Sequence, residues 1–329
     1  MKNVLEFTTP PIITAFAGVA GKKEGQGPLQ NGFDVILDDD TLGFNNWEKA
    51  ESEMMKSCIK TLLQKSGKSE QHIDYLLSGD LLNQCSGSAF SMRDFNIKYL
   101  GLFGACSTMA EGIAVASVLS STYAGCCIAS TSSHFCSAEK QFRFPLEYGG
   151  QRAQTSQWTV TGSGSVVIEK TGTGVKVKRA LMGKIIDLDV KNVNNMGAAM
   201  APAACDTVSL FLKETGESPD NYDLIVTGDL AFEGEKLFKK LMQTEGYSMG
   251  SNYTDSGLMI YDRNEEDVHA GGSGCGCSAL VLTSHILPKM MNKELKRVLF
   301  IGTGALMSQT TALQGESIPG IAHLIELEI

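Results

Sequence analysis

The apolar and polar positions along the chain predict one succession of elements that occurs twice. Residues 47–65 carry apolar side chains at helical spacing and end in a polar turn, after which an apolar run of strand length leads to Ser78-Gly79-Asp80-Leu81. Residues 201–215 repeat the helical spacing, and the strand pattern that follows leads to Thr227-Gly228-Asp229-Leu230. A succession repeated about half a chain length later predicts an internal duplication.

The elements that follow in each copy also correspond. Residues 104–122 open with Gly-Ala-Cys-Ser-Thr and predict a helix, and a strand follows at 125–130. In the second copy a glycine-rich turn precedes 278–291, which we expect to be helical although 279–283 alone would suit a strand; a strand follows at 297–301. This alternation predicts an α/β fold in which mixed sheets carry helices on both faces.

A Thr/Gly-rich stretch at residues 170–176 lies between two strand patterns and predicts the boundary between the copies. We therefore expect two α/β halves, residues 1–172 and 173–329. The chain has 329 residues, of which 43% are hydrophobic, enough to bury a large core.

Charge and cysteine usage narrow the class of protein. A formal net charge of −9 argues against nucleic acid as a partner, because phosphate binding needs Lys and Arg. The N-terminus shows no apolar signal segment, and no apolar run approaches the ~20 residues of a membrane span. The nine cysteines lack zinc-site spacing, so we expect a soluble intracellular chain with reduced thiols and no metal site.

Cys106 is the strongest candidate for a functional residue. It follows the short apolar stretch Leu102-Phe103-Gly104-Ala105 and precedes the predicted helix. The positive end of a helix lowers the pKa of a thiol and makes it a better nucleophile. The same place would also bind a carboxylate or phosphate without chemistry, and a small residue there would also serve close packing.

Three long stretches carry a resemblance to a known family: Gly101–Gly112, Ser132–Phe144 and Pro145–Gly164, the last with Gln157-Trp158-Thr159-Val160-Thr161-Gly162. Together with the duplicated halves they resemble the thiolase superfamily, which includes the ketoacyl-synthase III enzymes. Within it the chain is most similar to the stage V sporulation protein AD family of spore-forming bacteria. The resemblance implies a thiolase-like duplicated fold, two βαβαβαββ-type halves whose mixed sheets pack around central helices. It also implies that Cys106 stands where the enzymes are acylated.

The resemblance implies two further catalytic groups that the second half does not supply. The enzymes place a His just after the strand at 223–228, where this chain has Gly228-Asp229. They place an Asn or a second His in the glycine-rich turn, which reads Gly271-Gly272-Ser273-Gly274 here, with His269 two residues before it. A lost oxyanion donor costs roughly 10²–10³ in rate, and a lost proton carrier roughly 10²–10⁴. We therefore expect no enzyme; the alternative is a residual acyl-transfer or condensing enzyme that uses Cys106.

The family implies binding of dipicolinic acid, pyridine-2,6-dicarboxylate, for its uptake into the developing spore. The ligand is the free acid or its calcium chelate, so calcium is expected only as part of the ligand, and no cofactor is expected. A flat ring with two carboxylates would suit a pocket between the helix starts near Cys106 and Ser278.

The candidate ligand-binding residues lie around these two helix starts. They are Cys106, Ser107, His134, Trp158, Thr161, Asp229, Gly272, Ser273 and Gly274. Each has a structural alternative: His134 would line the pocket or sit in the core, and Trp158 would stack on the pyridine ring or fill the core. Asp229 would be a polar wall, a calcium ligand through the chelate or a turn residue, and its twin Asp80 favours the turn. Lys140 and Arg143 would flank the site or form a solvated face.

Partners and localisation follow from the resemblance as well. It implies other proteins of the stage V sporulation A operon, with the chain held peripherally at the forespore or spore inner membrane through them. A homodimer through the first half is left open. So is a purely structural subunit whose pocket is vestigial.

Overall fold

The computed structural model describes residues 3–142, 151–264 and 267–329. The first half contains β1 Val4–Glu6, β2 Ile12–Ala20, β3 Val35–Ile36, α1 Trp47–Ser66, β4 Tyr75–Gly79, α2 Ser86–Ser91, β5 Tyr99–Gly101, α3 Thr108–Thr122, β6 Cys126–Ser133, α4 Phe135–Phe142, β7 Trp158–Thr159 and β8 Gly162–Glu169. The second half contains β9 Val175–Met182, α5 Met196–Thr215, β10 Leu224–Thr227, α6 Ala231–Thr244, β11 Tyr253–Asp255, α7 Ser256–Met259, β12 Gly272–Ser273, α8 Cys275–Val281, the π-helical turn Leu282–Ile286, α9 Leu287–Met291, β13 Arg297–Ala305, α10 Gln309–Leu313 and β14 Gly320–Glu328.

The order of the strands shows the duplication directly. The main sheet runs β11-β10-β13-β14-β9-β2-β8-β6-β4-β5. In the first half β2, β8 and β6 are antiparallel neighbours, and β6, β4 and β5 are parallel neighbours. In the second half β9, β14 and β13 are antiparallel, and β13, β10 and β11 are parallel. Each half therefore has the same strand order and the same directions.

The two half-sheets join at one corner, where β2 and β9 pair through Ile12–Lys176 and Ile13–Val175. The predicted boundary stretch lies in the connection between β8 and β9, although β9 already begins at Val175.

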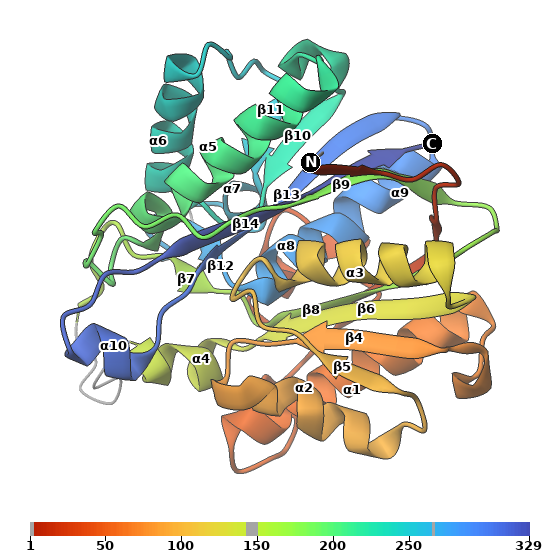
Figure 1. Ribbon diagram of the computed structural model, residues 1–329. Helices are drawn as coiled ribbons and strands as arrows, with labels where there is room; N and C mark the ends of the chain where they lie inside the picture. Colours follow the sequence, from red (N-terminus) through yellow and green to blue (C-terminus); the bar gives the residue numbers. More distant parts are fainter. Residues whose placement is uncertain (1–2, 143–150, 265–266) are drawn as a thin grey trace.

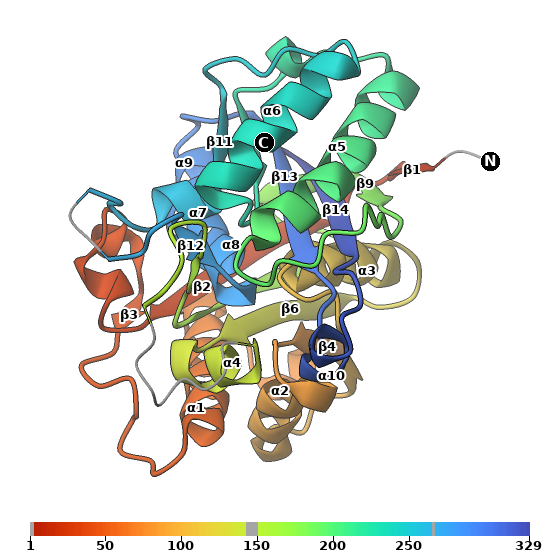
Figure 2. The same ribbon diagram turned by 90° about the vertical axis from the view of Figure 1, so that its left-hand side faces the viewer.

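The molecule is layered around two central helices. In Figures 1 and 2, α1 and α2 cover the outer face of the first half-sheet, and α5 and α6 cover the outer face of the second. Helix α3 contacts strands of both half-sheets, and α8 contacts α3 and the strands of the first half-sheet. The architecture is thus the predicted thiolase-like one, with its sheets packed around central helices.

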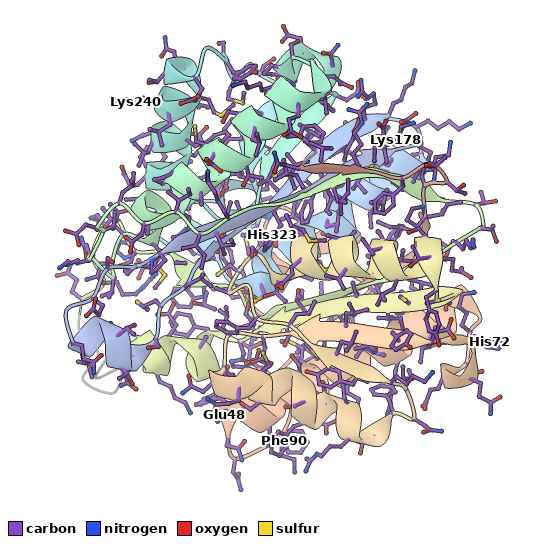
Figure 3. All side chains as sticks on the ribbon, in the orientation of Figure 1. Glu48, His72, Phe90, Lys178, Lys240 and His323 are labelled. Atoms are coloured by element: carbon purple, nitrogen blue, oxygen red, sulfur yellow. The ribbon has the colours of Figure 1, made fainter. Side chains whose placement is uncertain are left out.

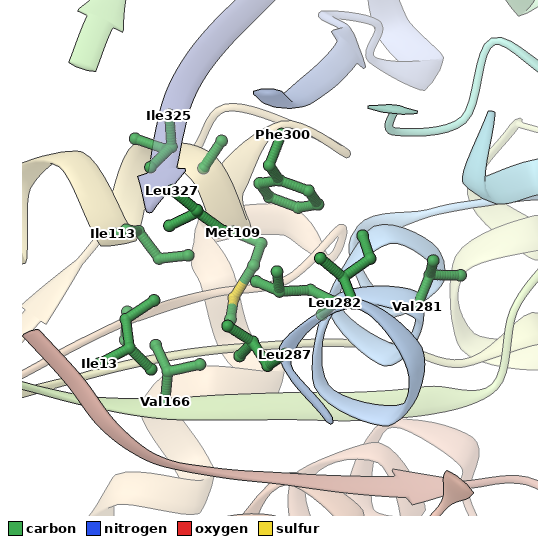
Figure 4. Packing of buried hydrophobic residues seen from close by; sticks show 14 of the residues in the cluster. Ile13, Met109, Ile113, Val166, Val281, Leu282, Leu287, Phe300, Ile325 and Leu327 are labelled. Atoms are coloured by element: carbon green, nitrogen blue, oxygen red, sulfur yellow. The ribbon is translucent and has the colours of Figure 1, made fainter. Parts of the chain in front are cut away.

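The main core lies between the two half-sheets. Figure 4 shows Met109 of α3 among apolar side chains of both halves, including Val166, Leu282, Phe300 and Leu327. These side chains are fully buried. Because both halves complete the same core, neither can lose its inner face without exposing apolar surface.

The helices that open each copy are capped in the same way. Asn46 accepts from the Lys49 N–H at the start of α1, and Asn195 accepts from the Ala198 N–H at the start of α5. Gly67 ends α1 in the left-handed conformation at φ 66°, and its counterpart Gly216 ends α5 at φ 69°.

The structure confirms the predicted elements and moves some of their ends. Residues 278–291 are helical, and the helix begins three residues earlier, at Cys275. Helix α5 begins at Met196 rather than at residue 201, and α3 begins at Thr108, after Cys106 as predicted. Strand β13 continues to Ala305, beyond the predicted end at residue 301, so Gly302 and Gly304 lie inside it.

Candidate functional site

A cavity of about 610 Å³ opens in front of Cys106, where the two halves meet. Its floor is buried and includes Cys106 and Ser273, which are 6% and 7% exposed. The described residues that line it carry no charged side chain: Leu81, Asn83, Gln84, Cys85, Phe103, Ala105, Cys106, Thr159, Met196, Ser273, Ala305, Leu306, Met307, Ser308, Gln309 and Thr311. The cavity therefore combines a polar floor, apolar walls and a mouth rich in amide and hydroxyl groups.

A strained loop holds Cys106 before α3. Ala105 has a left-handed backbone at φ 49°, which costs a non-glycine residue about 1–3 kcal/mol. The loop is tied by the Ser107 hydroxyl, which donates to the Gly104 carbonyl at 2.6 Å. It lies so close to β13 that a Cβ on Gly304 would come within 2.3 Å of the Gly104 oxygen. Close packing of the two halves thus fixes the position of the thiol.

Asp229 lies directly behind the cavity floor and is fully buried. Its carboxylate accepts from the Ser273 hydroxyl at 3.0 Å, the Gly274 N–H at 2.9 Å and the Thr303 hydroxyl at 2.8 Å. The neighbouring Cys106 thiol is among the groups that act on the pKa of this carboxyl. Burial raises the pKa of Asp229 while these donors lower it, the net direction being upward. Asp229, which stands where the resemblance implies a catalytic His, is therefore a buried acceptor that holds Ser273, Gly274 and Thr303 behind the cavity floor.

The environment of Cys106 corrects the expectation of a lowered thiol pKa. Burial, then the neighbouring Asp229, raises the pKa of Cys106 well above its ordinary value. Asp229 would repel a thiolate, and burial removes the water that would solvate it. These effects outweigh the start of α3.

The structure also corrects the expectation that free N–H groups of the two helix starts would hold carboxylates. At α8 the Gly274 N–H is bonded to Asp229, and the Gly276 N–H is bonded to the Ser133 hydroxyl at 3.0 Å. Before α3 the Ser107 and Thr108 N–H groups bond to carbonyls of their own turn. In the cavity lining, the Thr159 and Ser273 hydroxyls also donate to protein carboxylates, whereas Asn83, Gln84 and Gln309 present side-chain amides.

His134 is part of the core rather than of the cavity lining. It is 1% exposed, its Nε2 bonds to the Asp40 carbonyl at 2.9 Å, and its Nδ1 accepts from the Cys136 N–H. Its ring lies 5.4 Å from that of Trp47.

Trp158 and Thr161 also lie outside the cavity lining. The Trp158 ring stacks on Phe135 with the centroids 4.0 Å apart, and Lys23 and Arg152 lie over it. Neighbouring residues of a strand face opposite sides, so it is Thr159 that lines the cavity. The Thr161 hydroxyl accepts from the Phe135 N–H.

The other candidates have structural places as well. Ser107 and Gly272 are buried but do not line the cavity, and Gly274 has φ 103° at the start of α8. His269 lies outside the lining and pairs with Asp267 at 2.9 Å. Lys140 pairs with Glu48, and Arg143 lies outside the described residues. Of the nine candidates, Cys106 and Ser273 line the cavity, and Asp229 and Gly274 support them from behind.

Much of the lining was not predicted from the sequence. Asn83, Gln84 and Cys85 follow the end of β4, and residues 305–309 and Thr311 follow or end β13. Ligands meet α/β sheets at the carboxyl ends of strands, so both segments could have been found from the two predicted strand ends.

Comparison with known proteins gives the family. The family described as stage V sporulation protein AD matches residues 1–328. A stage V sporulation protein AD of Bacillus subtilis strain 168 is 43% identical over 328 residues, which cover 99% of this chain and 97% of that protein. The chain belongs to the stage V sporulation protein AD family. The family is named for sporulation and not for a reaction.

Solved structures of low sequence identity share the fold of this family member. A single-residue variant of Xanthomonas campestris OleA superposes with a TM-score of 0.62 at 12% identity, over 99% of both chains. A 3-oxoacyl-[acyl-carrier-protein] synthase III from Aquifex aeolicus superposes with a TM-score of 0.55 at 10% identity, over 97% of this chain and 100% of that one. These likenesses confirm the thiolase-like, ketoacyl-synthase III-like fold.

All nine cysteines lie within the described residues and are free thiols. None of the described helices is both long and apolar enough to cross a membrane.

Proposed function

We propose that this member of the sporulation family binds dipicolinic acid in the cavity in front of Cys106, as the free acid or as its calcium chelate, and serves its uptake into the developing spore. The observation that carries the proposal is the cavity itself. Its volume of about 610 Å³ is in the range of small-molecule sites, and both halves contribute to its walls. Leu81, Phe103 and Met307 offer apolar surface for a flat ring.

Polar groups at two depths support the binding of a dicarboxylate. Ser273 and Thr159 are buried in the floor, and Asn83, Gln84 and Gln309 are exposed at the mouth. The amides at the mouth donate hydrogen bonds to carboxylates. The floor hydroxyls of Ser273 and Thr159 already donate to Asp229 and Glu139, so they offer their oxygens, as acceptors or as ligands for the Ca²⁺ of the chelate. Calcium enters the proposal only as part of the ligand.

The test is a titration of the purified chain with dipicolinate, with and without Ca²⁺, followed by calorimetry. We expect saturable binding that Ser273→Ala weakens about tenfold, or about 1.4 kcal/mol, because the floor loses a buried oxygen that accepts from the protonated acid or binds the calcium of the chelate. Gln309→Ala should weaken it less. Gln314→Ala, on the same connection but outside the lining, is the matched control and should bind normally.

The outcomes separate the alternatives. No saturable binding in either condition would overturn the proposal and leave the pocket vestigial. Isophthalate, which has the same two carboxylates but no ring nitrogen, reports whether the nitrogen contributes. An acyl group found on Cys106 by mass spectrometry after incubation with acyl-CoA would favour the acyl-transfer alternative instead.

We also propose a homodimer through the first half. Strand β5 ends the main sheet, with Leu100 39% and the nearby Phe103 48% exposed, and Figure 3 shows Phe90 of α2 at the surface of the same half. At the other end of the sheet, Tyr253 and Asp255 of β11 are buried. Light scattering should find a dimer that Leu100→Glu dissociates; a monomeric wild-type chain would overturn this. Association with the spore inner membrane through the other operon proteins completes the proposal.

A further inference from the structure

Two loops of the first half meet at the cavity, and both contain strained backbone. Loop 81–85, after β4, has two consecutive left-handed residues, Gln84 at φ 57° and Cys85 at φ 51°. Loop 102–106, between β5 and α3, has Ala105 at φ 49°. Non-glycine residues in this conformation persist only where the surrounding structure holds them, and they gather at functional sites. The two loops supply much of the cavity lining, including Asn83, Gln84, Cys85, Phe103, Ala105 and Cys106.

A thiol hydrogen bond joins the two loops. The Cys85 Sγ donates to the Leu102 carbonyl at 3.1 Å. Cys85 is 9% exposed, so little water competes for this weak donor. Phe103, which lines the cavity and is 48% exposed, follows directly on Leu102. The bond therefore connects the left-handed turn to the backbone beside an apolar wall of the cavity.

The later part of loop 102–106 is held by other donors. The Ser107 hydroxyl donates to the Gly104 carbonyl at 2.6 Å, and the Cys275 thiol of α8 donates to the Ala105 carbonyl at 3.0 Å. These bonds fix the backbone just before Cys106 from α3 and α8. Loss of the Cys85 thiol would thus loosen the beginning of the loop and leave its end in place.

We propose that Cys85 is a positioning residue of the cavity, whose thiol couples the strained turn that carries Asn83 and Gln84 to the wall that carries Phe103. The inference rests on the proposed function, in which this cavity binds the ligand. A ligand then meets amides and an apolar wall that are already at a fixed separation. A mouth that had to be ordered during binding would lower the affinity, because the cost of ordering is subtracted from the binding free energy.

Hydrogen exchange, followed by mass spectrometry of peptides, measures the coupling without a ligand. The Cys85 N–H bonds to the Leu82 carbonyl at 3.0 Å and the Leu102 N–H bonds to the Ser78 carbonyl at 2.9 Å, so both loops contain protected amides. Cys85→Ala should raise the exchange rates in both loops by roughly three- to tenfold, the range that follows from losing one hydrogen bond. Cys85→Ser keeps a donor on the same backbone and should retain the wild-type rates.

The matched control is Cys205→Ala. Cys205 lies on α5, is 7% exposed and is outside the lining formed by the described residues. Its removal should leave the exchange of both loops unchanged. An unchanged rate in loop 102–106 of Cys85→Ala would overturn the proposal. Equally fast exchange in Cys85→Ser would overturn it too, because the size of the side chain and not its hydrogen bond would then join the loops.

Cys85→Gly separates positioning from stability. Glycine adopts the left-handed conformation without strain, so this variant should melt at a higher temperature than Cys85→Ala. It still lacks the thiol, so loop 102–106 should exchange as fast as in Cys85→Ala. Wild-type exchange in that loop would show that strain at residue 85, and not the thiol, controls it, and would overturn the proposal. Cys85→Gly also replaces Cys85→Ala in every comparison if the alanine variant does not fold.

Dipicolinate titration connects the bond to the ligand. Cys85→Ala should bind about tenfold more weakly if the mouth then occupies its binding position only about a tenth of the time, whereas Cys85→Ser should bind like the wild type. Faster exchange with unchanged affinity would overturn the role of Cys85 in binding. A wild-type chain that binds no dipicolinate would overturn the proposed function, and the exchange rates would still decide whether the thiol joins the two loops. The two proposals therefore fail separately.

Discussion

The two halves place an aspartate at the same point after their central parallel strands, yet the two carboxylates bond in different directions. Asp80 accepts local hydrogen bonds, from the Leu82 N–H at 2.7 Å and the Ser88 N–H at 2.6 Å. Asp229 accepts from groups 44 to 74 residues later in the chain, around the cavity floor. Asp80 therefore stabilises the turn to which it belongs, whereas Asp229 stabilises the floor of the cavity.

A third carboxylate explains the difference. Asp255, at the end of β11, accepts from the Leu230 and Ala231 N–H groups at 2.9 Å each and from the Thr227 hydroxyl at 2.6 Å. It thus organises the turn after β10, as Asp80 does after β4. Because Asp255 bonds to that turn, the Asp229 carboxylate bonds to groups around the cavity floor instead. A duplicated position in the sequence therefore does not imply a duplicated role.

The largest expected effect comes from removing Asp255. Asp255→Ala leaves the buried N–H groups of Leu230, Ala231 and Gly257 without their acceptor, at about 1–3 kcal/mol each. We expect a loss of at least about 3 kcal/mol in the free energy of unfolding, measured by denaturant titration. Asp267→Ala removes a carboxylate whose side chain is 85% exposed and should change almost nothing. A loss of under about 1 kcal/mol in Asp255→Ala would show that the turn does not depend on it.

The same comparison shows how far the sequence alone predicts this protein. The duplication, the order of helices and strands and the place of Cys106 just before a helix all follow from apolar spacing and from matching turns, which are local properties. Asp229 had a twin in Asp80, and the twin favoured a turn residue for both. That interpretation holds for Asp80 and not for Asp229, because nothing local to residue 229 reveals that Asp255 bonds to the turn.

The cavity lining was harder to predict for a related reason. Trp158 and Thr159 are adjacent, and which of them faces the cavity depends on the register of β7 against β12. The availability of N–H groups at the helix starts depends on Asp229 and Ser133, which come from distant strands. Pairing between distant segments decides such questions, and spacing along the chain does not report it.

A second prediction concerns Glu51, a buried acid of the first half. Glu51 lies near Asp80 and accepts from the Ser132 and Ser137 hydroxyls, and burial raises its pKa from 4.5 to about 8. An acid whose pKa is raised on folding stabilises the fold fully below its unfolded pKa, and this contribution is lost as the pH rises to the folded value. Stability should therefore fall between about pH 5 and pH 8, by up to about 1.4 kcal/mol per pH unit from this group.

Glu51→Gln stays neutral throughout and should make that slope shallower, as seen in denaturation midpoints at pH 5.5, 6.5 and 7.5. The slope should not vanish, because burial also raises the pKa of Asp255 in the second half to about 7. Glu53→Gln, on the same helix and paired with Lys56 at 2.6 Å, should keep the wild-type slope. An identical slope in Glu51→Gln and the wild type would mean that Glu51 is ionised in the fold.

The strand ends that touch the two central helices provide a third test. Ser133 ends β6, and its hydroxyl meets the start of α8; Gly304 of β13 lies against the loop before α3. A Cβ at Gly304 would be 2.3 Å from the Gly104 oxygen and 3.2 Å from the Ser107 nitrogen. Gly304→Ala should therefore cost about 1–3 kcal/mol by overpacking and displace the Cys106 loop, with weaker dipicolinate binding. Ser133→Ala should cost about 1 kcal/mol by losing hydrogen bonds. Equal binding by both variants would show that the loop adapts.

The smallest expected effect tests a single bond of Asp229. Thr303→Val keeps the shape of the side chain and removes both the hydroxyl that donates to the carboxylate at 2.8 Å and the oxygen that accepts from the Asp229 N–H at 3.0 Å. Two donors to the carboxylate remain, the Ser273 hydroxyl and the Gly274 N–H, so we expect a cost of about 1–2 kcal/mol in thermal or denaturant unfolding. Thr303→Ser keeps the hydroxyl and should lose less. Ser132→Ala is the corresponding change in the first half, because the hydroxyl of Ser132 on β6 donates to Glu51 at 3.0 Å. If the costs of Ser132→Ala and Thr303→Val do not add in the double variant, the two carboxylates act as one network; additive costs would show that each carboxylate is held separately.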